Sequence, residues 1–339
     1  MVDVAVFGAG SWGTALAAHL ADNGHAVRMW CHSEELAREI RERRENAQYL
    51  PGAPLSDRIE PTSDPERALS KAQYVLSVLP SQYTRKVWME ARDFLGKGVP
   101  VLCASKGIER DTLKLMSQVF DDLVPSNPTG FIGGPSFAKE VIRHVPTAIV
   151  IASRDEGMVT TAQQLMSCDW MRAYFVNDVI GVEIGGSLKN VIAIACGCAD
   201  GLGLGHNTRA AIITRGLAEM TRLAVNMGAD PRTLAGLAGI GDLVLTCTGD
   251  LSRNRRVGLA LGQGRSLQSI LDEMGQVAEG VETTISARDL ARQQGVEMPI
   301  TEEVYRVVHE QKPVKDCLLA LMRRELKHEF YGQDPAKRS

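Results

Sequence analysis

The sequence predicts an α/β N-terminal domain with a mostly parallel sheet, followed by an all-α C-terminal domain. Two observations carry this prediction. Short apolar, β-like runs alternate with polar helical stretches in the first half, and helical patterns rich in Ala, Leu, Ile and Gly follow from about residue 178. The length of 339 residues fits about two domains of about 150 residues each. We expect a first domain over residues 1–180, a second over residues 181–331, and a polar tail over residues 332–339.

Apolar runs and helical spacing place the individual elements. The expected strands are residues 2–7, 26–30, 74–79, 99–104, 129–132 and 147–152. In the first half, helical patterns occupy residues 14–21, 34–44 and 84–95. In the second half, the expected helices are residues 185–199, 207–227, 253–261, 281–294, 299–309 and 315–328.

Composition excludes several classes of protein. With 44% hydrophobic residues and a net charge of −3, the chain is neither a disordered segment nor a general binder of nucleic acid or anionic membranes. No uninterrupted apolar run reaches the roughly 18 residues of a membrane span, and the N-terminus lacks a secretory pattern, so we expect a cytoplasmic protein. The seven cysteines form no CxxC and the seven histidines no HExxH; buried reduced thiols and no metal are expected.

The glycine motif Gly8-Ala-Gly10-Ser11-Trp12-Gly13 directly follows the first strand and opens a helix. The first glycine permits a tight turn, the second lets the backbone approach a pyrophosphate, and the third allows close helix packing. The helix N-terminus adds free amides and a positive dipole end. A second strand follows at the right distance, so the motif predicts a Rossmann-type domain that binds NAD or NADP. The alternative is a glycine turn without a ligand.

The end of the second strand bears on the choice of cofactor. An acidic residue there would hold the ribose hydroxyls of NAD, but Cys31 and His32 occupy the expected place. This favours NADP, with His32 or Ser33 near the 2′-phosphate. Glu34 and Glu35 follow closely and either oppose that phosphate or simply begin the next helix, where acids suit the dipole.

Lys189 stands alone in a stretch of small and apolar residues, 185–193. Small residues allow another element to pack closely, so we expect the lysine to be partly buried and suited to proton transfer. The alternative is a lysine that reaches solvent from a helix edge. Asp242 follows a glycine-rich segment, and it either caps the next helix or serves the site.

Ser252, Arg253 and Asn254 stand together at a predicted helix start. A hydroxyl, a guanidinium, an amide and a helix N-terminus together suit a phosphate group, and the alternative is a solvated basic helix face. Lys106 follows the strand expected at residues 99–104 and would lie beyond its carboxyl end, where ligands of such sheets bind.

Several motifs together resemble the bacterial type of NAD(P)-dependent glycerol-3-phosphate dehydrogenase. The similarity runs in family order from the first strand to about residue 328. The motifs are Gly8-Ala-Gly-Ser-Trp-Gly-Thr-Ala-Leu-Ala, Asn46-Ala-Gln-Tyr-Leu-Pro-Gly52, Ser105-Lys-Gly-Ile108, Gly133-Gly-Pro-Ser-Phe-Ala138, Gly186-Ser-Leu-Lys-Asn190, Gly239-Ile-Gly-Asp-Leu243 and Ser252-Arg-Asn-Arg255.

The resemblance implies roles for individual residues. Lys189 would be the general acid and base at the substrate C2 oxygen, oriented by Asp242. The substrate would contact Lys106, Gly134, Ser136, Lys189, Asp242, Ser252, Arg253 and Asn254. The cofactor would contact Gly8, Gly10, Ser11, Trp12, Gly13, His32, Lys106, Ala138, Arg253, Val277 and Glu279. Many family members carry arginine where this chain has Cys31 and His32, which leaves the preference for NADP open.

The implied function is reduction of dihydroxyacetone phosphate, a small phosphorylated substrate, to glycerol 3-phosphate for phospholipid synthesis. One alternative is another two-domain reductase, of the hydroxyacid or ketopantoate type, but a free carboxylate has less need of the cluster at Ser252, Arg253 and Asn254. Another is a catalytically silent NADP sensor, which would not need both Lys106 and Lys189. A homodimer built on the helical half is expected from fold analogy.

Overall fold

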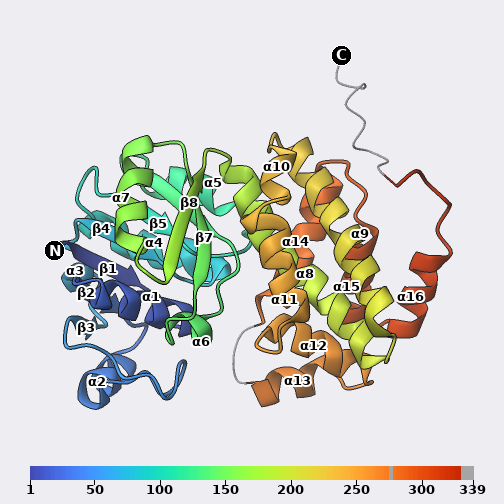
Figure 1. The fold of residues 1–339 in the computed structure, drawn as a ribbon, viewed down its shortest axis with the longest axis horizontal. Helices are drawn as coiled ribbons and strands as arrows, with labels where there is room; N and C mark the ends of the chain where they lie inside the picture. Colours follow the sequence, from blue (N-terminus) through green and yellow to red (C-terminus); the bar gives the residue numbers. More distant parts are fainter. Residues whose placement is uncertain (275–277, 330–339) are drawn as a thin grey trace. The chain divides into compact units, whose positions relative to one another are not determined.

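The computed structural model describes residues 1–274 and 278–329 (Figure 1). Contacts divide the chain into two compact units: residues 1–109 with 114–182, and residues 110–113 with 183 onward. The division falls two residues after the expected boundary and lies within helix α8 (Val179–Gly201). The assignment of residues 110–113 to the second unit was not predicted, and the expected tail at residues 332–339 lies outside the described residues.

An eight-stranded sheet forms the first unit, in the order β3–β2–β1–β4–β5–β6–β7–β8. The strands from β3 to β6 in this order are parallel, β7 is antiparallel to β6, and β8 is parallel to β7. The predicted mostly parallel sheet is therefore confirmed. The strands are β1 Asp3–Phe7, β2 Ala26–Trp30, β3 Ile59–Thr62, β4 Tyr74–Ser77, β5 Val101–Cys103, β6 Thr129–Gly133, β7 Thr147–Ser153 and β8 Met171–Val176.

The two strands that the sequence analysis missed, β3 and β8, are the two edges of this sheet. β3 contains Glu60 and Pro61, and a proline is tolerated in a sheet mainly at an edge because it cannot donate to a ladder. β8 carries the exposed side chains Arg172, Tyr174 and Phe175. The central strands β1, β4 and β5 are almost entirely buried, so they read as apolar runs and were found.

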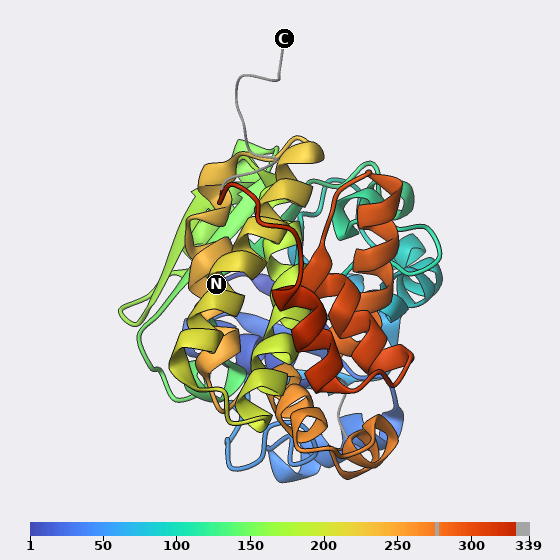
Figure 2. The same ribbon diagram turned by 90° about the vertical axis from the view of Figure 1, so that its right-hand side faces the viewer.

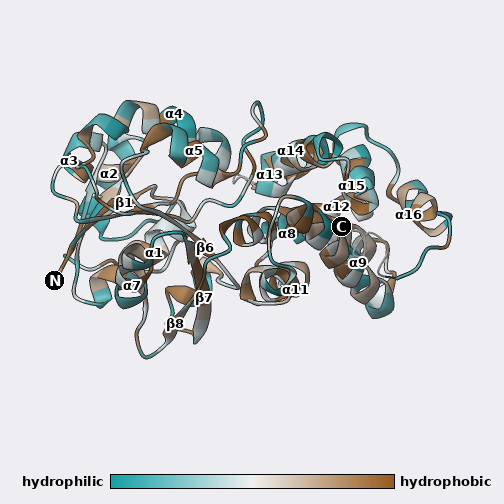
Figure 3. Cartoon of the chain, turned by 90° about the horizontal axis from the view of Figure 1, so that it is seen from above, coloured by the Kyte–Doolittle hydropathy of each residue, from teal (hydrophilic) through white to brown (hydrophobic). Residues whose placement is uncertain are grey.

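Helices cover both faces of the sheet: α4 and α5 lie on one face, and α1 and α7 on the other (Figure 3). Their apolar sides bury the core residues between helix and strand, as a doubly wound sheet requires. The helices of this unit are α1 Ser11–Asp22, α2 Glu34–Arg43, α3 Pro65–Leu69, α4 Ser81–Ala91, η1 Arg92–Phe94, α5 Met116–Leu123, α6 Ala138–Val141 and α7 Glu156–Met166.

The regular elements described in the second unit are all helical, which confirms the predicted all-α half (Figure 2). The last helix ends at Met322 and not at the expected residue 328. Leu326, which the predicted helix included, is fully exposed, so a longer helix would gain no packing from it. Besides α8, the elements are α9 Gly205–Asn226, α10 Pro231–Leu234, the π-helical turn η2 Leu237–Gly241, α11 Asp242–Thr248, α12 Arg253–Gly262, α13 Leu267–Met274, α14 Glu279–Gln293, α15 Pro299–His309 and α16 Val314–Met322.

Helices α8 and α12 approach so closely that their contact has no room for a Cβ atom. A side chain at Gly197 would overlap the backbone of Arg255, and one at Gly258 would overlap the Ile194 carbonyl. Two glycines on each helix, four residues apart, make this backbone contact possible. The contact fixes the register between the two helices that carry Lys189 and Arg253.

Helix α8 is long and apolar enough to cross a membrane when judged by length and composition alone, with a mean hydropathy of 1.5. The sequence offers no uninterrupted apolar run of that length, but a window average tolerates the few polar residues that break the run. Of that apolar window, 89% is buried inside the protein, as in the core helix of a soluble domain.

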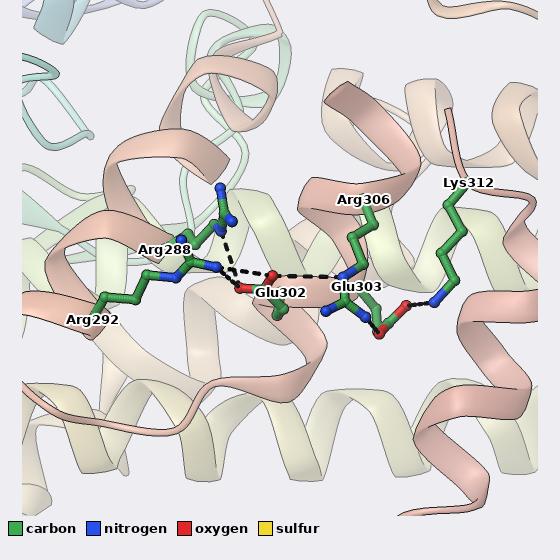
Figure 4. A network of polar contacts seen from close by, with 6 residues as sticks. All are labelled: Arg288, Arg292, Glu302, Glu303, Arg306 and Lys312. Atoms are coloured by element: carbon green, nitrogen blue, oxygen red, sulfur yellow. Dashed lines mark hydrogen bonds and ion pairs between the residues drawn. The ribbon is translucent and has the colours of Figure 1, made fainter. Parts of the chain in front are cut away.

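Ion pairs join α14, α15 and the segment before α16 (Figure 4). Glu302 accepts hydrogen bonds from Arg288 and Arg292, and Glu303 accepts from Arg306 and Lys312. The Arg288 guanidinium also lies over the ring of Tyr305, 3.7 Å from its centroid. Most of these groups are partly exposed, so each pair contributes little alone, and the network acts mainly to orient the helices.

A buried carboxylate from α9 holds the start of α15. Glu219 accepts hydrogen bonds from the backbone N–H of Ile300 at 2.6 Å and of Thr301 at 3.2 Å, and from the Thr301 hydroxyl. The carboxylate thus satisfies backbone amides that the first turn of a helix leaves without partners. Burial nevertheless raises the pKa of Glu219 to about 7, against the opposing effect of its hydrogen bonds.

This shift predicts a pH-dependent stability. The folded pKa of Glu219 lies above the ordinary value of 4.5, so its contribution to stability is full below pH 4.5 and is lost as the pH rises through about 7. Glu219→Gln should remove this slope, which is on the order of 3 kcal/mol across the window. Thermal unfolding of both proteins between pH 4.5 and 7 measures it. Glu310→Gln, at an exposed carboxylate after α15, is the matched control; an unchanged slope in Glu219→Gln would contradict the assignment.

Candidate functional site

The loop between β1 and α1 can be built only with glycine at two positions. Gly8 has a φ of 130°, in the region that favours glycine, and a Cβ there would lie 2.5 Å from the Val78 carbonyl oxygen. A Cβ on Gly13 would overlap the carbonyl oxygen of Gly8. The chain therefore turns sharply from strand to helix and packs α1 tightly against the loop, as the motif predicts.

The other side of this loop is open. A Cβ on Gly10 would meet no atom within 4 Å, and no side chain of the described residues caps the N-terminus of α1. The Trp12 indole N–H is buried and has no hydrogen-bond partner within the described part of the chain. Uncapped amides, an open approach and a buried donor that needs an acceptor all fit the pyrophosphate of a dinucleotide.

A segment that the sequence analysis did not assign to the cofactor site supports this loop. The buried amide of Asn46 donates to the Ala9 carbonyl and to the Thr14 hydroxyl, both at 2.8 Å. The Ser11 hydroxyl donates to the Tyr49 carbonyl at 2.6 Å. The signal in the sequence is the motif from Asn46 to Gly52, which contributes to the family resemblance.

The end of β2 places His32 at the surface and Cys31 inside, where burial raises the pKa of the Cys31 thiol to about 12. Ser33 is the N-cap of α2, and its hydroxyl accepts the Leu36 N–H at 3.3 Å. Glu34 and Glu35 form the first turn of α2, as one of the two sequence interpretations expected. Glu34 also accepts a hydrogen bond from the Ser63 hydroxyl at 2.6 Å, which lowers the pKa of its carboxyl group.

Other predicted residues of the first unit follow the carboxyl ends of parallel strands. Lys106 is half-buried in the loop after β5, and Gly134 follows β6 with a φ of 101°. The Ser136 hydroxyl donates to the Gly134 carbonyl at 3.1 Å, and Ala138 begins α6. Because β1, β2, β5 and β6 are parallel, the loops with Gly8, His32, Lys106 and Gly134 gather at one edge of the sheet.

The second unit contains a buried ion pair. Lys189 of α8 is 7% exposed and donates to the carboxylate of Asp242, which is 1% exposed. The alternative of a lysine that reaches solvent is therefore wrong. Asp242 does not cap a helix either: it is the first residue of α11, Gly241 is the N-cap, and the carboxylate faces the lysine.

Glycines explain how Asp242 reaches the lysine. A Cβ on Gly185 of α8 would overlap the Ala238 carbonyl, so the backbone of η2 lies directly on α8. The turn η2 then leads into Asp242. The Thr246 hydroxyl donates to the Asp242 carbonyl at 2.6 Å and lies 3.4 Å from its carboxylate. Thr246 was missed because a threonine within a short helix carries no distinguishing pattern.

The predicted phosphate-binding cluster lies at the start of α12. Ser252 is its N-cap and accepts the Arg255 N–H at 3.2 Å, and Arg253 is the first helical residue. Asn254 is buried; it donates to the Asn190 side chain and accepts the Gly280 N–H, both at 2.9 Å. One of its two amide hydrogens is thus used within the protein, and Asn190 is a further buried polar residue that the sequence analysis did not single out.

Glu279 is the first residue of α14, and the predicted cofactor residue Val277 lies outside the described residues. Within residues 1–274 and 278–329, no group of three or more His, Cys, Asp or Glu side chains is arranged to hold a metal ion. Among the described residues no disulfide joins any of the seven cysteines, and all except Cys168 are buried. The polar chemistry of the described site residues is thus that of ammonium, guanidinium, carboxylate, hydroxyl and amide groups.

Known proteins share this architecture and sequence. Two family models, described as the N-terminus and the C-terminus of NAD-dependent glycerol-3-phosphate dehydrogenase, match residues 3–159 and 178–319. Proteins named glycerol-3-phosphate dehydrogenase (NAD(P)+) from Citrifermentans bemidjiense and Geobacter sulfurreducens are 52% and 53% identical over 331 and 329 residues, or 96% of this chain and 98% of each relative. A crystal structure of glycerol-3-phosphate dehydrogenase from Coxiella burnetii has a TM-score of 0.93 at 38% identity and covers 95% of this chain and 99% of that one. The chain therefore belongs to the NAD-dependent glycerol-3-phosphate dehydrogenase family.

Proposed function

We propose that this chain interconverts dihydroxyacetone phosphate and sn-glycerol 3-phosphate by hydride transfer with NAD(P)H. The observation that carries the proposal is the buried pair of Lys189 and Asp242, because a ketone reductase needs a proton donor held away from water. The family matches do not favour the alternative of a hydroxyacid or ketopantoate-type reductase. Retention of the buried lysine argues against a silent NADP sensor.

The first unit would bind the cofactor, and the second would carry the acid–base group. The uncapped start of α1 and the indole N–H of Trp12 are suited to the cofactor's pyrophosphate. When bound, the reduced nicotinamide supplies the hydride. We assign cofactor contacts to Gly8, Gly10, Ser11, Trp12, Gly13, His32, Lys106, Ala138, Arg253, Val277 and Glu279.

Lys189 is the proposed proton donor to the C2 oxygen of dihydroxyacetone phosphate, and it takes the proton back in the reverse reaction. The carboxylate of Asp242 offsets the cost of burying the ammonium group and fixes its direction. Lys106 would stabilise the negative charge that develops on the same oxygen. No further proton carrier is needed for this step.

The substrate phosphate would be held at the start of α12. Arg253 offers a planar guanidinium there, and the helix dipole favours an anion at the same end. The remaining proposed substrate contacts are Gly134 and Ser136 in the first unit, with Ser252 and Asn254 in the second. Ser252 and Asn254 also have structural partners, so they would position Arg253 as well as touch the ligand.

We propose a preference for NADP over NAD. No carboxylate stands at the end of β2, and Glu34, the nearest acid in sequence, pairs with Ser63 and lies 3.6 Å from Arg41. His32 is exposed and available to a 2′-phosphate. By analogy with the family we further propose a cytoplasmic homodimer that supplies glycerol 3-phosphate for phospholipid synthesis.

The direct test is oxidation of NADPH and NADH by the purified protein with dihydroxyacetone phosphate. We expect turnover with both cofactors and a higher kcat/KM with NADPH. Ketopantoate serves as the control substrate, because it presents a ketone with a carboxylate in place of a phosphate. Reduction of ketopantoate but not of dihydroxyacetone phosphate would overturn the proposal.

Lys189→Ala should lower kcat at least ~1,000-fold, the range of a lost general acid, while NADPH still binds. Removal of the lysine leaves Asp242 buried without its cation, so the variant also loses stability. The double variant Lys189→Met with Asp242→Asn avoids that charge and should be equally inactive. Cofactor binding, followed by fluorescence, verifies the fold; near wild-type turnover in either variant would refute the assignment.

Arg253→Ala should raise the KM for dihydroxyacetone phosphate about 100-fold, because about two charge-assisted hydrogen bonds are lost. Arg256→Ala is the matched control, since Arg256 is an exposed arginine of the same helix. Steady-state kinetics with both variants separates a specific phosphate contact from a general loss of positive charge. Equal KM values for the two variants would exclude Arg253 as the phosphate ligand.

A further inference from the structure

One side of α4 holds the loop that carries Lys106. The Leu79 carbonyl, just before the helix, accepts a hydrogen bond from the Ser105 hydroxyl at 2.5 Å. The Gln82 amide donates to the Ile108 carbonyl at 2.8 Å. Arg85 reaches Glu109. The segment from Leu79 to Arg85, at the start of α4, therefore contacts the loop both before and after Lys106.

The contact between Arg85 and Glu109 is the strongest of these. The guanidinium Nε donates to one carboxylate oxygen at 2.8 Å, and a terminal nitrogen donates to the other at 2.9 Å. This two-point arrangement fixes direction as well as distance. The side chain of Glu109 is only 11% exposed and that of Arg85 28%, so water screens the pair less than it would a surface pair.

A second carboxylate keeps Arg85 in place. Asp122 of α5 accepts from Arg85 at 3.0 Å and from Lys114 at 2.6 Å. The Lys114 ammonium, with Arg85, lowers the pKa of the Asp122 carboxyl group. Asp122 is more exposed than Glu109, 39% against 11%, and it contacts the guanidinium from α5, outside the loop that carries Lys106.

We infer that Arg85 is a positioning residue for the reaction: through Glu109 it sets the place of the Lys106 ammonium. The inference rests on the proposed role of Lys106 at the substrate. Residues 104–115, between β5 and α5, form no helix or named strand, so the shape of this loop depends on such side-chain contacts. An isolated antiparallel bridge between the buried residues Ile108 and Leu115 closes the loop after Lys106.

The test compares Arg85→Gln, Arg85→Lys and the control Lys86→Gln, at an exposed cation of the same helix. Arg85→Gln loses the two-point contact and should lower kcat/KM for dihydroxyacetone phosphate about tenfold, since small misplacements of a reacting group are costly. Arg85→Lys retains one charged hydrogen bond and should fall between Arg85→Gln and wild type. Lys86→Gln should stay within about twofold of wild type. Equal kinetics for Arg85→Gln and wild type would overturn the inference.

A double variant separates positioning from a general loss of stability. If Arg85 acts through Lys106, Arg85→Gln should change kcat/KM by less than about twofold once Lys106→Ala is present. A full tenfold loss in that background would show that Arg85 acts by another route and would refute the inference.

Hydrogen exchange of the amides at residues 104–109 gives a readout independent of activity. Arg85→Gln should speed exchange there, while exchange in β1 and α8 stays unchanged. Unchanged exchange in the loop would refute the inference whatever the kinetics. A different result would be faster loop exchange in Arg85→Gln together with full activity of Lys106→Ala. It would show that Arg85 holds the loop but that Lys106 has no role in the reaction. Failure of the inference about Arg85 can therefore be distinguished from failure of the proposed role of Lys106.

Discussion

Much of the second unit follows from one constraint: an ammonium group buried in the most apolar helix of the chain must have a charged partner. Lys189 finds that partner in Asp242, which belongs to a separate element. To deliver Asp242, η2 must lie against α8, and this contact is possible only because residue 185 has no side chain. The glycine and the charged residues therefore serve one requirement: the backbones must approach closely so that the charged side chains can meet.

Close backbone contacts at glycines occur in both units, but they have a different effect in each. In the first unit, glycines bring α1 against the end of β1 and leave backbone amides directed at open space. In the second unit, glycines bring helix backbones together and exclude other atoms, so that the polar side chains near the contact have few available directions. Asn190 and Asn254 illustrate this, because each amide is fixed by the neighbouring helix or loop. Small residues thus provide access in one case and orientation in the other.

The sequence predicted the central architecture because burial leaves a strong pattern. Strands such as β2, buried within the sheet, were placed to the residue, whereas the edge strands β3 and β8 were missed because Pro61 and Arg172 break the apolar run. The glycine loop, Lys189 and the start of α12 could also be predicted, since glycine next to a strand, an isolated lysine and a capped helix start are local signals. The contacts of Asp242 with Lys189 and of Asn46 with the glycine loop join distant segments, and a helix cap was an equally good local explanation of Asp242. Thr246 lies only one helical turn after Asp242, but a threonine within a short helix carries no distinguishing pattern.

The cysteines carry a consequence of a different kind. Burial raises the pKa of Cys31, Cys198 and Cys317 to about 12 and that of Cys247 well above its ordinary value. Thiolates are the reactive form, so these thiols react slowly with alkylating and oxidising reagents while the chain is folded. Cys31 belongs to the sheet unit and the other three to the helical unit. The protein therefore contains native labels in each unit whose reactivity with a thiol reagent reports how often that part of the chain opens.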